Sequence, residues 1–118
     1  MSGGVDSSTA ACLLLEQGYE VIGISLKLFG FGEEGATAEC GAGCCGIKGV
    51  DDARAVAQRL GIPFYAVDCE REFRDTVIAY FIREYANGRT PNPCVVCNEA
   101  IKFGFLLERA RSLGADHI

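Results

Sequence analysis

The sequence predicts an α/β fold with a parallel sheet, and three observations carry that prediction. Helix-like and strand-like segments follow one another along the 118 residues as helix, strand, helix, strand, helix, helix. The strand-like segments are short, and the two are separated by a helical pattern, as expected for parallel strands joined by a helical crossover. A glycine-bearing loop, of the kind that normally follows a strand in such folds, opens the chain.

The first part of the chain is expected to form a helix, a strand and a loop. Residues 8–17 follow a helical pattern that ends at Gly18. Residues 20–28 place apolar side chains at alternate positions, which predicts a strand. Residues 29–49 are rich in glycine and hold three cysteines, so we expect a loop there.

The middle of the chain repeats the helix and strand order. Asp51 is expected to cap a helix over 52–60, which Gly61 and Pro63 end. Residues 64–67 then form a short strand.

Two further helices are expected in the last part. The first covers 71–86, and the second covers 98–113 after a loop over 89–97. Apolar side chains recur at four-residue steps along the first and predict a core-facing stripe, formed by Phe73, Val77, Phe81 and Tyr85. His117 and Ile118 look like the opening of another strand. We therefore expect a domain that is incomplete at both ends.

Composition narrows the class of protein. Eleven Lys and Arg against 16 Asp and Glu give a net charge of −5, so a strongly basic nucleic-acid arm is absent. No apolar run approaches the ~18 residues that span a bilayer. The first residues lack the basic start and apolar stretch of a signal peptide. These features predict a cytoplasmic protein with no membrane partner.

Seven cysteines need an explanation. Their number is odd and no export signal precedes them, so a reducing compartment fits better than a secreted disulfide framework. Cys12 and Cys69 lie in apolar surroundings and are expected to be small buried side chains. A zinc site that recruits Cys40, Cys44 and Cys45 is a weaker alternative, because their spacing is not a standard ligand set.

Residues 2–8 read Ser-Gly-Gly-Val-Asp-Ser-Ser and lead directly into a helix. Glycines let main-chain N–H groups approach an anion, and the start of the helix adds unpaired N–H groups and partial positive charge. The serine hydroxyls can donate to phosphate oxygens, and a metal ion suits Asp6. The segment therefore predicts an anion site. The alternative is a helix that Asp6 or Ser7 merely caps.

Cys94 and Cys97 form a Cys-x-x-Cys pair expected just before a helix. Such a pair can ligate a metal or cluster, or act as a redox pair. A helix N-terminus also favours the nucleophilic thiolate. Arg89 and Lys102 are the candidate cations beside it. The alternative is half of a zinc knuckle or a pair of thiols without a function.

Both motifs resemble known families. Residues 2–8 are similar to the pyrophosphate loop of the PP-loop ATP pyrophosphatases. Residues 88–104 read Gly-Arg-Thr-Pro-Asn-Pro-Cys-Val-Val-Cys-Asn-Glu-Ala-Ile-Lys-Phe-Gly and closely resemble the tRNA-specific 2-thiouridylase family. Residues 50–54, 60–65 and 113–118 also look like that family, so the resemblance covers essentially the whole chain.

The resemblance implies a fold and a reaction. Residues 1–118 would be part of a PP-loop ATP pyrophosphatase domain, which is adenine nucleotide α-hydrolase-like, and the tRNA-binding domains would lie outside this chain. ATP with Mg would adenylate the O2 atom of the wobble uridine in tRNA. A cysteine persulfide, loaded by a cysteine desulfurase or a relay protein, would then supply sulfur to give 2-thiouridine, AMP and pyrophosphate.

The resemblance also implies roles for individual residues. Cys97 matches the nucleophile, and Cys94 stands beside it as a second catalytic residue. The segment that meets the target base and tRNA would be Asn92, Pro93, Cys94 and Lys102. The residues that match ATP contacts are Met1, Ser2, Gly3, Gly4, Val5, Asp6, Ser7, Ser8 and Leu26.

Two departures from the family pattern matter. Many members have Asp where this chain has Cys94, and the Cys94–Cys97 pair instead resembles members proposed to bind a four-iron iron–sulfur cluster through three cysteines, the third of which would lie outside this chain. The persulfide cysteine also lies beyond Ile118, so we expect this piece to be inactive alone. Two alternatives stay open, namely another PP-loop enzyme (a tRNA thiolase or an amidating ligase) and a non-enzymatic zinc or thiol module.

Overall fold

The computed structural model describes residues 1–28 and 47–118. These divide into two compact units, Met1–Asp68 and Cys69–Ile118. Most of the loop expected over 29–49 lies outside the described residues. The hypothesis of a zinc site at Cys40, Cys44 and Cys45 lies there as well.

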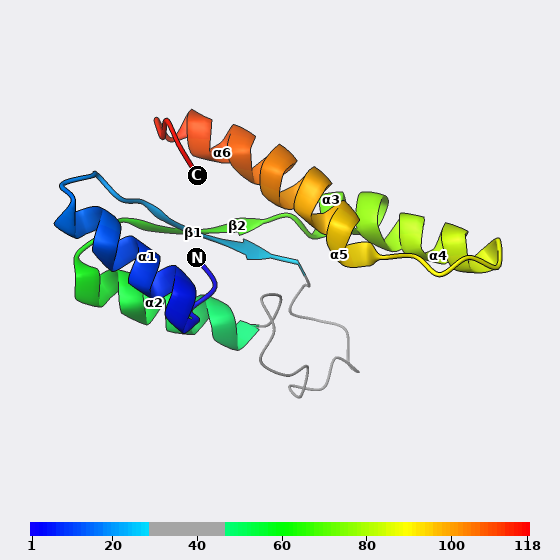
Figure 1. The fold of residues 1–118 in the computed structure, drawn as a ribbon, viewed down its shortest axis with the longest axis horizontal. Coiled ribbons are helices and arrows are strands. Elements are labelled where there is room, and N and C mark those ends of the chain that lie inside the picture. Colours follow the sequence, from blue (N-terminus) through cyan, green and yellow to red (C-terminus); the bar gives the residue numbers. More distant parts are fainter. Residues whose placement is uncertain (29–46) are drawn as a thin grey trace. The chain divides into compact units, whose positions relative to one another are not determined.

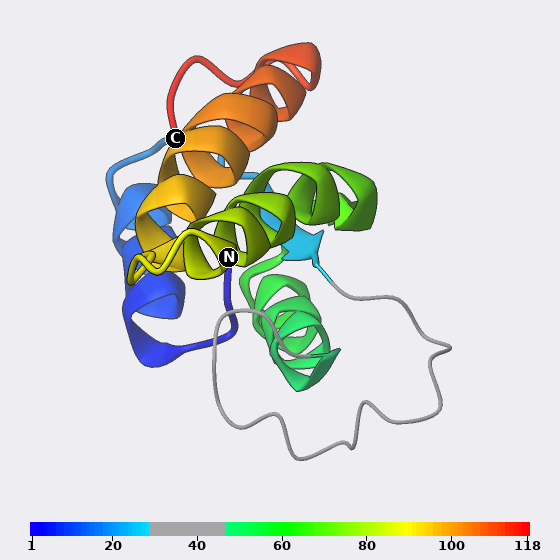
Figure 2. The same cartoon turned by 90° about the vertical axis from the view of Figure 1, so that its right-hand side faces the viewer.

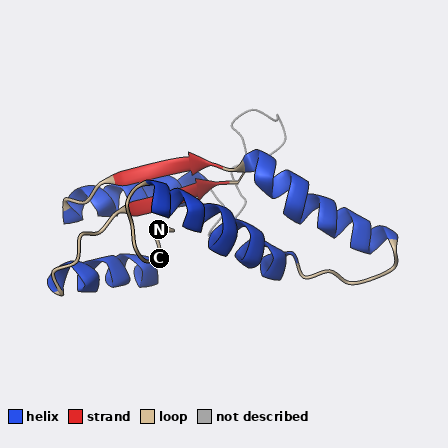
Figure 3. Ribbon diagram, turned by 90° about the horizontal axis from the view of Figure 1, so that it is seen from above, coloured by secondary structure: helices blue, strands red, loops and turns tan. Residues whose placement is uncertain are grey.

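The first unit confirms the α/β prediction. It runs in the order α1 (Val5–Glu16), β1 (Gly23–Lys27), α2 (Ile47–Leu60) and β2 (Phe64–Asp68). The two strands are parallel and paired from Gly23 opposite Phe64 to Lys27 opposite Asp68. Figure 3 shows both arrows pointing the same way, and Figure 1 shows α1 and α2 running beside each other along the strands. The unit is therefore a β-α-β crossover preceded by one helix.

The expected helix and strand boundaries in this unit shift. Helix α1 begins at Val5, three residues earlier than expected, and β1 is shorter than the expected 20–28. The prediction that Asp51 caps the second helix is wrong, because α2 already begins at Ile47 and Asp51 lies in its second turn. Gly49 lies inside the helix, where glycine lowers helix stability, but a Cβ atom at this position would lie only 3.0 Å from the carbonyl oxygen of Ser2.

The core of the first unit lies where α2 meets the strands. Ala53 and Ala57 are fully buried on one face of α2. Ile24 and Leu28 are buried along β1 and the residue after it, and Ala11 is buried on α1. Alanines at the contact allow a helix to lie close to a strand, because their side chains occupy little space.

The second unit consists of two helical runs that lie side by side (Figure 2). Both runs contain a π-helical middle, which the side-chain periodicity did not indicate. The first comprises α3 (Glu70–Phe73), η1 (Arg74–Ile78) and α4 (Ala79–Ala86). The second comprises α5 (Pro93–Val96), η2 (Cys97–Phe105) and α6 (Leu106–Ser112).

The expected core-facing stripe on the first run is correct at only one end. Phe73 and Val77 are buried, whereas Phe81 is 37% exposed and Tyr85 is 59% exposed. With 3.6 residues per turn, a four-residue step overshoots a full turn by about 40°, so the stripe winds away from the partner helix. The two exposed rings pack on each other instead, with centroids 4.9 Å apart.

Other buried side chains hold the second unit together. Val77 and Ile101 are each 1% exposed, and Cys69 is buried as expected. The same expectation for Cys12 in the first unit holds only in part, because that side chain is half-buried. Within residues 1–28 and 47–118, no helix has the length and apolar character needed to cross a membrane.

The buried contact between the helical runs predicts that substitutions of two isoleucines lower the free energy of unfolding by different amounts. Ile101→Ala should lower the free energy of unfolding by about 3 kcal/mol, because it leaves a cavity in the core. Ile82→Ala removes the same atoms from a side chain that is 62% exposed and should cost no more than about 0.5 kcal/mol. Urea unfolding of both variants checks this, and equal losses would contradict the described packing.

Candidate functional site

Residues 1–4, here called the opening loop, lie against helix α2. Gly3 has φ +78°, a left-handed conformation that glycine adopts without strain. A Cβ atom at Gly3 would lie 2.7 Å from both the Cβ of Asp52 and the carbonyl oxygen of Gly49, and 2.8 Å from the nitrogen of Ala53. Only glycine therefore fits between the loop and the helix.

Serine hydroxyl groups close the opening loop onto the first turn of α1. The Ser2 main-chain N–H donates to the hydroxyl of Ser7 at 3.3 Å, and the Ser2 and Ser7 hydroxyl oxygens lie 3.2 Å apart. The N–H of Gly4 donates to the Ser2 hydroxyl at 3.4 Å, while the Ser8 hydroxyl donates to the Gly4 carbonyl at 2.8 Å. The loop is thus a small hydroxyl-lined turn.

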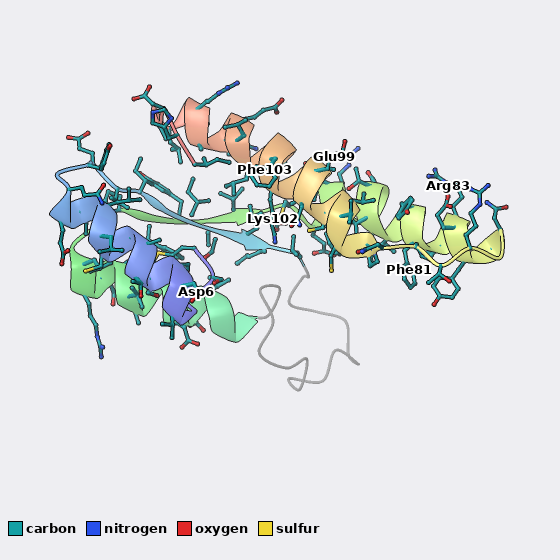
Figure 4. The ribbon with its side chains drawn as sticks, viewed as in Figure 1. Asp6, Phe81, Arg83, Glu99, Lys102 and Phe103 are labelled. Atoms are coloured by element: carbon teal, nitrogen blue, oxygen red, sulfur yellow. The ribbon has the colours of Figure 1, made fainter. Side chains whose placement is uncertain are left out.

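The N-terminus of α1 has no side-chain cap. Its N-cap residue is Gly4, and neither Asp6 nor Ser7 accepts a capping hydrogen bond. The alternative interpretation of a merely capped helix is therefore wrong. Uncapped N–H groups and the positive end of a 12-residue helix are features that favour an anion, so the expectation of an anion site remains a prediction. The exposed carboxylate of Asp6 lies in the same first turn (Figure 4).

Two other expected nucleotide contacts belong to the same unit. Leu26 is half-buried near the carboxyl end of β1 and pairs in register with Val67. Met1 lies beside β1, where its main-chain nitrogen donates a hydrogen bond to the carbonyl of Ile24. Residues 1–8 and Leu26 thus belong to one unit. No pattern in the sequence indicated that Gly49 and Ala53 would contact the opening loop.

In the second unit, residues 92–97 form the paired-thiol segment, and the structure corrects its expected conformation. The loop expected over 89–97 is wrong at its end, because α5 begins at Pro93. Asn92 caps the helix by accepting a hydrogen bond from the N–H of Val95 at 3.4 Å, and Pro93 occupies the first helical turn. An Asn before a Pro is a helix-start signal that could have revealed this boundary.

The two thiols of this segment differ in exposure. Cys94 is exposed, whereas Cys97 is 9% exposed and begins η2. Residues three apart lie on neighbouring parts of one helix face, so the pair spans the boundary between surface and core. Of the candidate cations, Arg89 pairs with Glu84 at 3.2 Å, and Lys102 is half-buried on η2 (Figure 4).

The family resemblance implies Mg²⁺ and an iron–sulfur cluster, so the available ligand side chains are compared with what each of them requires. Among the described residues, no group of three or more His, Cys, Asp or Glu side chains could hold a metal ion. Cys94 and Cys97 supply two of the three cysteine ligands expected for an iron–sulfur cluster, and the third was expected outside this chain. Asp6 offers one hard oxygen donor beside the anion site, which suits Mg²⁺ bound mainly through phosphates.

Comparisons with known proteins agree on one family. The model of the tRNA methyl transferase HUP domain matches residues 1–118. The chain is 56% identical over 118 residues to the tRNA-specific 2-thiouridylase MnmA of Clostridium acetobutylicum. The corresponding proteins of Clostridium perfringens and Clostridioides difficile are 52% and 49% identical. Each alignment covers 100% of this chain but only 32–33% of the relative, so the chain spans about a third of the relatives' length.

The close approach of Gly3 to α2 predicts a costly substitution. Gly3→Ala should destabilise the protein by about 3 kcal/mol, because it adds steric overlap to an unfavourable φ. Gly18→Ala is the matched control. Gly18 has φ +85° but no atom within 4 Å of an added Cβ, so its replacement should cost about 1 kcal/mol. Urea unfolding distinguishes the two, and equal costs would contradict the contact.

The exposures of the thiols predict an order of chemical reactivity. Cys94 should be alkylated at least about tenfold faster than Cys97 in the native protein, and Cys69 should be slowest because it is 1% exposed. Timed iodoacetamide labelling with peptide mass spectrometry measures all three. Equal labelling of Cys94 and Cys97 would contradict the described burial, and labelling in denaturant provides the control for intrinsic reactivity.

Proposed function

The chain belongs to the tRNA methyl transferase HUP domain family, and from this membership we propose that it is the ATP-binding part of a tRNA uridine 2-sulfurtransferase. Residues 1–118 would be part of the PP-loop ATP pyrophosphatase domain. The tRNA-binding domains would lie in the rest of the full-length protein, of which this chain spans about a third in its relatives.

The opening loop is the observation that carries the proposal. Its backbone lies against α2 at Gly3, and the adjoining N-terminus of α1 is uncapped. These features support pyrophosphate binding by residues 1–8, because main-chain N–H groups and a helix N-terminus favour phosphate oxygens. We assign the ATP contact near the adenosine to Leu26 on β1. Asp6 would hold Mg²⁺, which would neutralise charge on the triphosphate.

The proposed reaction consumes one ATP for each uridine. The O2 atom of the wobble uridine attacks the α-phosphate of ATP, so pyrophosphate leaves and an adenylate forms at that oxygen. The terminal sulfur of a cysteine persulfide then attacks C2, and AMP departs with the former O2 atom, so the uridine carries a sulfur that is still joined to that cysteine by an S–S bond. Cys97 would attack the sulfur of that cysteine, which breaks the S–S bond, releases 2-thiouridine and forms a disulfide between the two cysteines. A thiol reductant would restore both thiols before the next turnover. The persulfide cysteine and its protein donor, a cysteine desulfurase or a relay protein, are outside this chain.

The paired-thiol segment is proposed to meet the target base. Asn92 and Pro93 would border the base, and Lys102 would contact the tRNA. We assign the nucleophile to Cys97, with Cys94 beside it, since the two cysteines lie three residues apart at the start of the second helical run and belong to the segment that most resembles the family. No step of the proposed reaction runs through an iron–sulfur cluster, whose third cysteine ligand would lie outside this chain.

Sulfur chemistry fits the chain better than the methyl transfer in the family's description. The relatives named above are all 2-thiouridylases, and a thiol pair lies in the segment that most resembles them. A cytoplasmic location belongs to the proposal. The described cysteines form no disulfide, as suits a reducing compartment where tRNA is modified.

The proposal predicts that Cys97→Ser in the full-length protein abolishes 2-thiouridine formation while ATP binding stays within about twofold. The reason is that serine cannot replace a thiolate nucleophile at neutral pH. The assay supplies ATP, Mg²⁺, undermodified tRNA and a persulfide donor, and nucleoside mass spectrometry measures the product. Cys12→Ser is the control, because Cys12 lies on α1 outside the proposed thiol pair.

Each contrary outcome has a distinct meaning. A methylated uridine in place of 2-thiouridine would overturn the proposed chemistry. Thiolation by the Cys97→Ser variant would remove the role assigned to Cys97. Stoichiometric zinc together with no ATP binding would favour a non-enzymatic thiol module.

A further inference from the structure

Met1, the first residue of the opening loop, is hydrogen-bonded to strand β1. Its main-chain nitrogen donates a hydrogen bond to the carbonyl of Ile24, and its carbonyl accepts one from the hydroxyl of Ser25. Its side chain also lies over the strand, since a Cβ atom at Gly23 would lie 3.2 Å from the Met1 sulfur. The position from which the loop departs is therefore fixed by three neighbouring residues of β1.

Ser25 is unusual among these three residues. Its side chain is 4% exposed, and it is the one polar residue in the buried set of the described residues. Burying a hydroxyl group costs free energy unless it is hydrogen-bonded, and Ser25 meets that requirement through the Met1 carbonyl. In a strand, an apolar side chain would serve packing equally well. The hydroxyl therefore contributes a bond to the opening loop rather than volume to the core.

The opposite side of the loop is fixed by backbone contact. Gly3 lies against α2 at Gly49, Asp52 and Ala53, so its Cα cannot move toward the helix. Between these two supports, only Ser2 separates Met1 from Gly3. Loss of the Ser25 hydrogen bond would free Met1 to move, while the packing of Gly3 against α2 would remain.

We propose that Ser25 is a positioning residue for nucleotide binding, which holds the opening loop at the geometry that receives the pyrophosphate of ATP. This inference rests on the proposed function. Ser25 directly precedes Leu26, the proposed adenosine contact. Adjacent residues of β1 would therefore act on the two ends of the bound nucleotide, Ser25 through the opening loop and Leu26 directly. Its hydroxyl itself is engaged with Met1 and acts through the loop, not on the phosphates.

The test compares Ser25→Val with Ser25→Thr in the full-length protein. The two replacements have nearly the same shape and both suit a strand, but only threonine keeps the hydroxyl. Isothermal titration with ATP–Mg and, separately, with inorganic pyrophosphate measures affinity. We expect Ser25→Val to weaken both ligands by about tenfold, as loss of a buried hydrogen bond predicts, and Ser25→Thr to stay within about twofold of the wild type.

Further measurements separate positioning from plain stability. Ser112→Ala removes an exposed hydroxyl on α6, far along the sequence from the loop, and should leave both affinities unchanged. Melting temperatures without ligand report stability for every variant. If Ser25→Val lowers the melting temperature but binds both ligands as Ser25→Thr does, Ser25 is merely structural and the inference is overturned.

The remaining outcomes distinguish this inference from the proposed function. If the wild-type protein binds ATP and Ser25→Val binds it equally well, the inference fails and the proposed function stands. If Ser25→Val weakens ATP but not pyrophosphate, the loop is not what Ser25 positions, and the inference again fails. If the folded wild type binds neither ligand, both fall together.

Discussion

The contact between Gly3 and helix α2 is the constraint on which the first unit depends. Without a Cβ atom at residue 3, the main chain of the opening loop comes within contact distance of the backbone of α2. The loop then turns through a left-handed residue into Gly4, so α1 begins without a capping side chain. A helix N-terminus whose N–H groups stay unsatisfied by its own sequence is suited to an anionic ligand.

In the second unit, the second helical run has one face buried in the core and another exposed to solvent. Helices α5 and η2 pack along the first helical run, and the packed face includes Cys97 and Ile101. Cys94, three residues earlier, remains exposed. Two chemically equal side chains thereby acquire different environments. Burial slows the reaction of a thiol with oxidants and alkylating reagents, while exposure makes its neighbour accessible to them.

Local patterns anticipated the order and type of the elements better than their ends. The parallel strand pair, the presence of a helix between the two strands and the burial of Cys69 followed from side-chain patterns. The starts of α2 at Ile47 and of α5 at Pro93 were not anticipated. Asp51, the expected helix cap, lies inside α2, and the helix-start signal of Asn92 before Pro93 falls within the segment expected to be a loop. The exposure of Phe81 and Tyr85 was missed because a four-residue repeat winds around a helix that is packed on only part of its length.

The sequence by itself determined the α/β class, the chemical inventory of the glycine loop and the thiol pair, and the family to which the chain belongs. Only the tertiary structure decided that Gly3 touches α2, that Ser25 binds a residue 24 positions away, and that Cys97 rather than Cys94 is buried. The physical reason is the separation along the sequence between the residues that make contact. Side-chain periodicity records neighbours three or four residues apart, whereas these contacts join segments that the chain brings together only when its helices and strands pack.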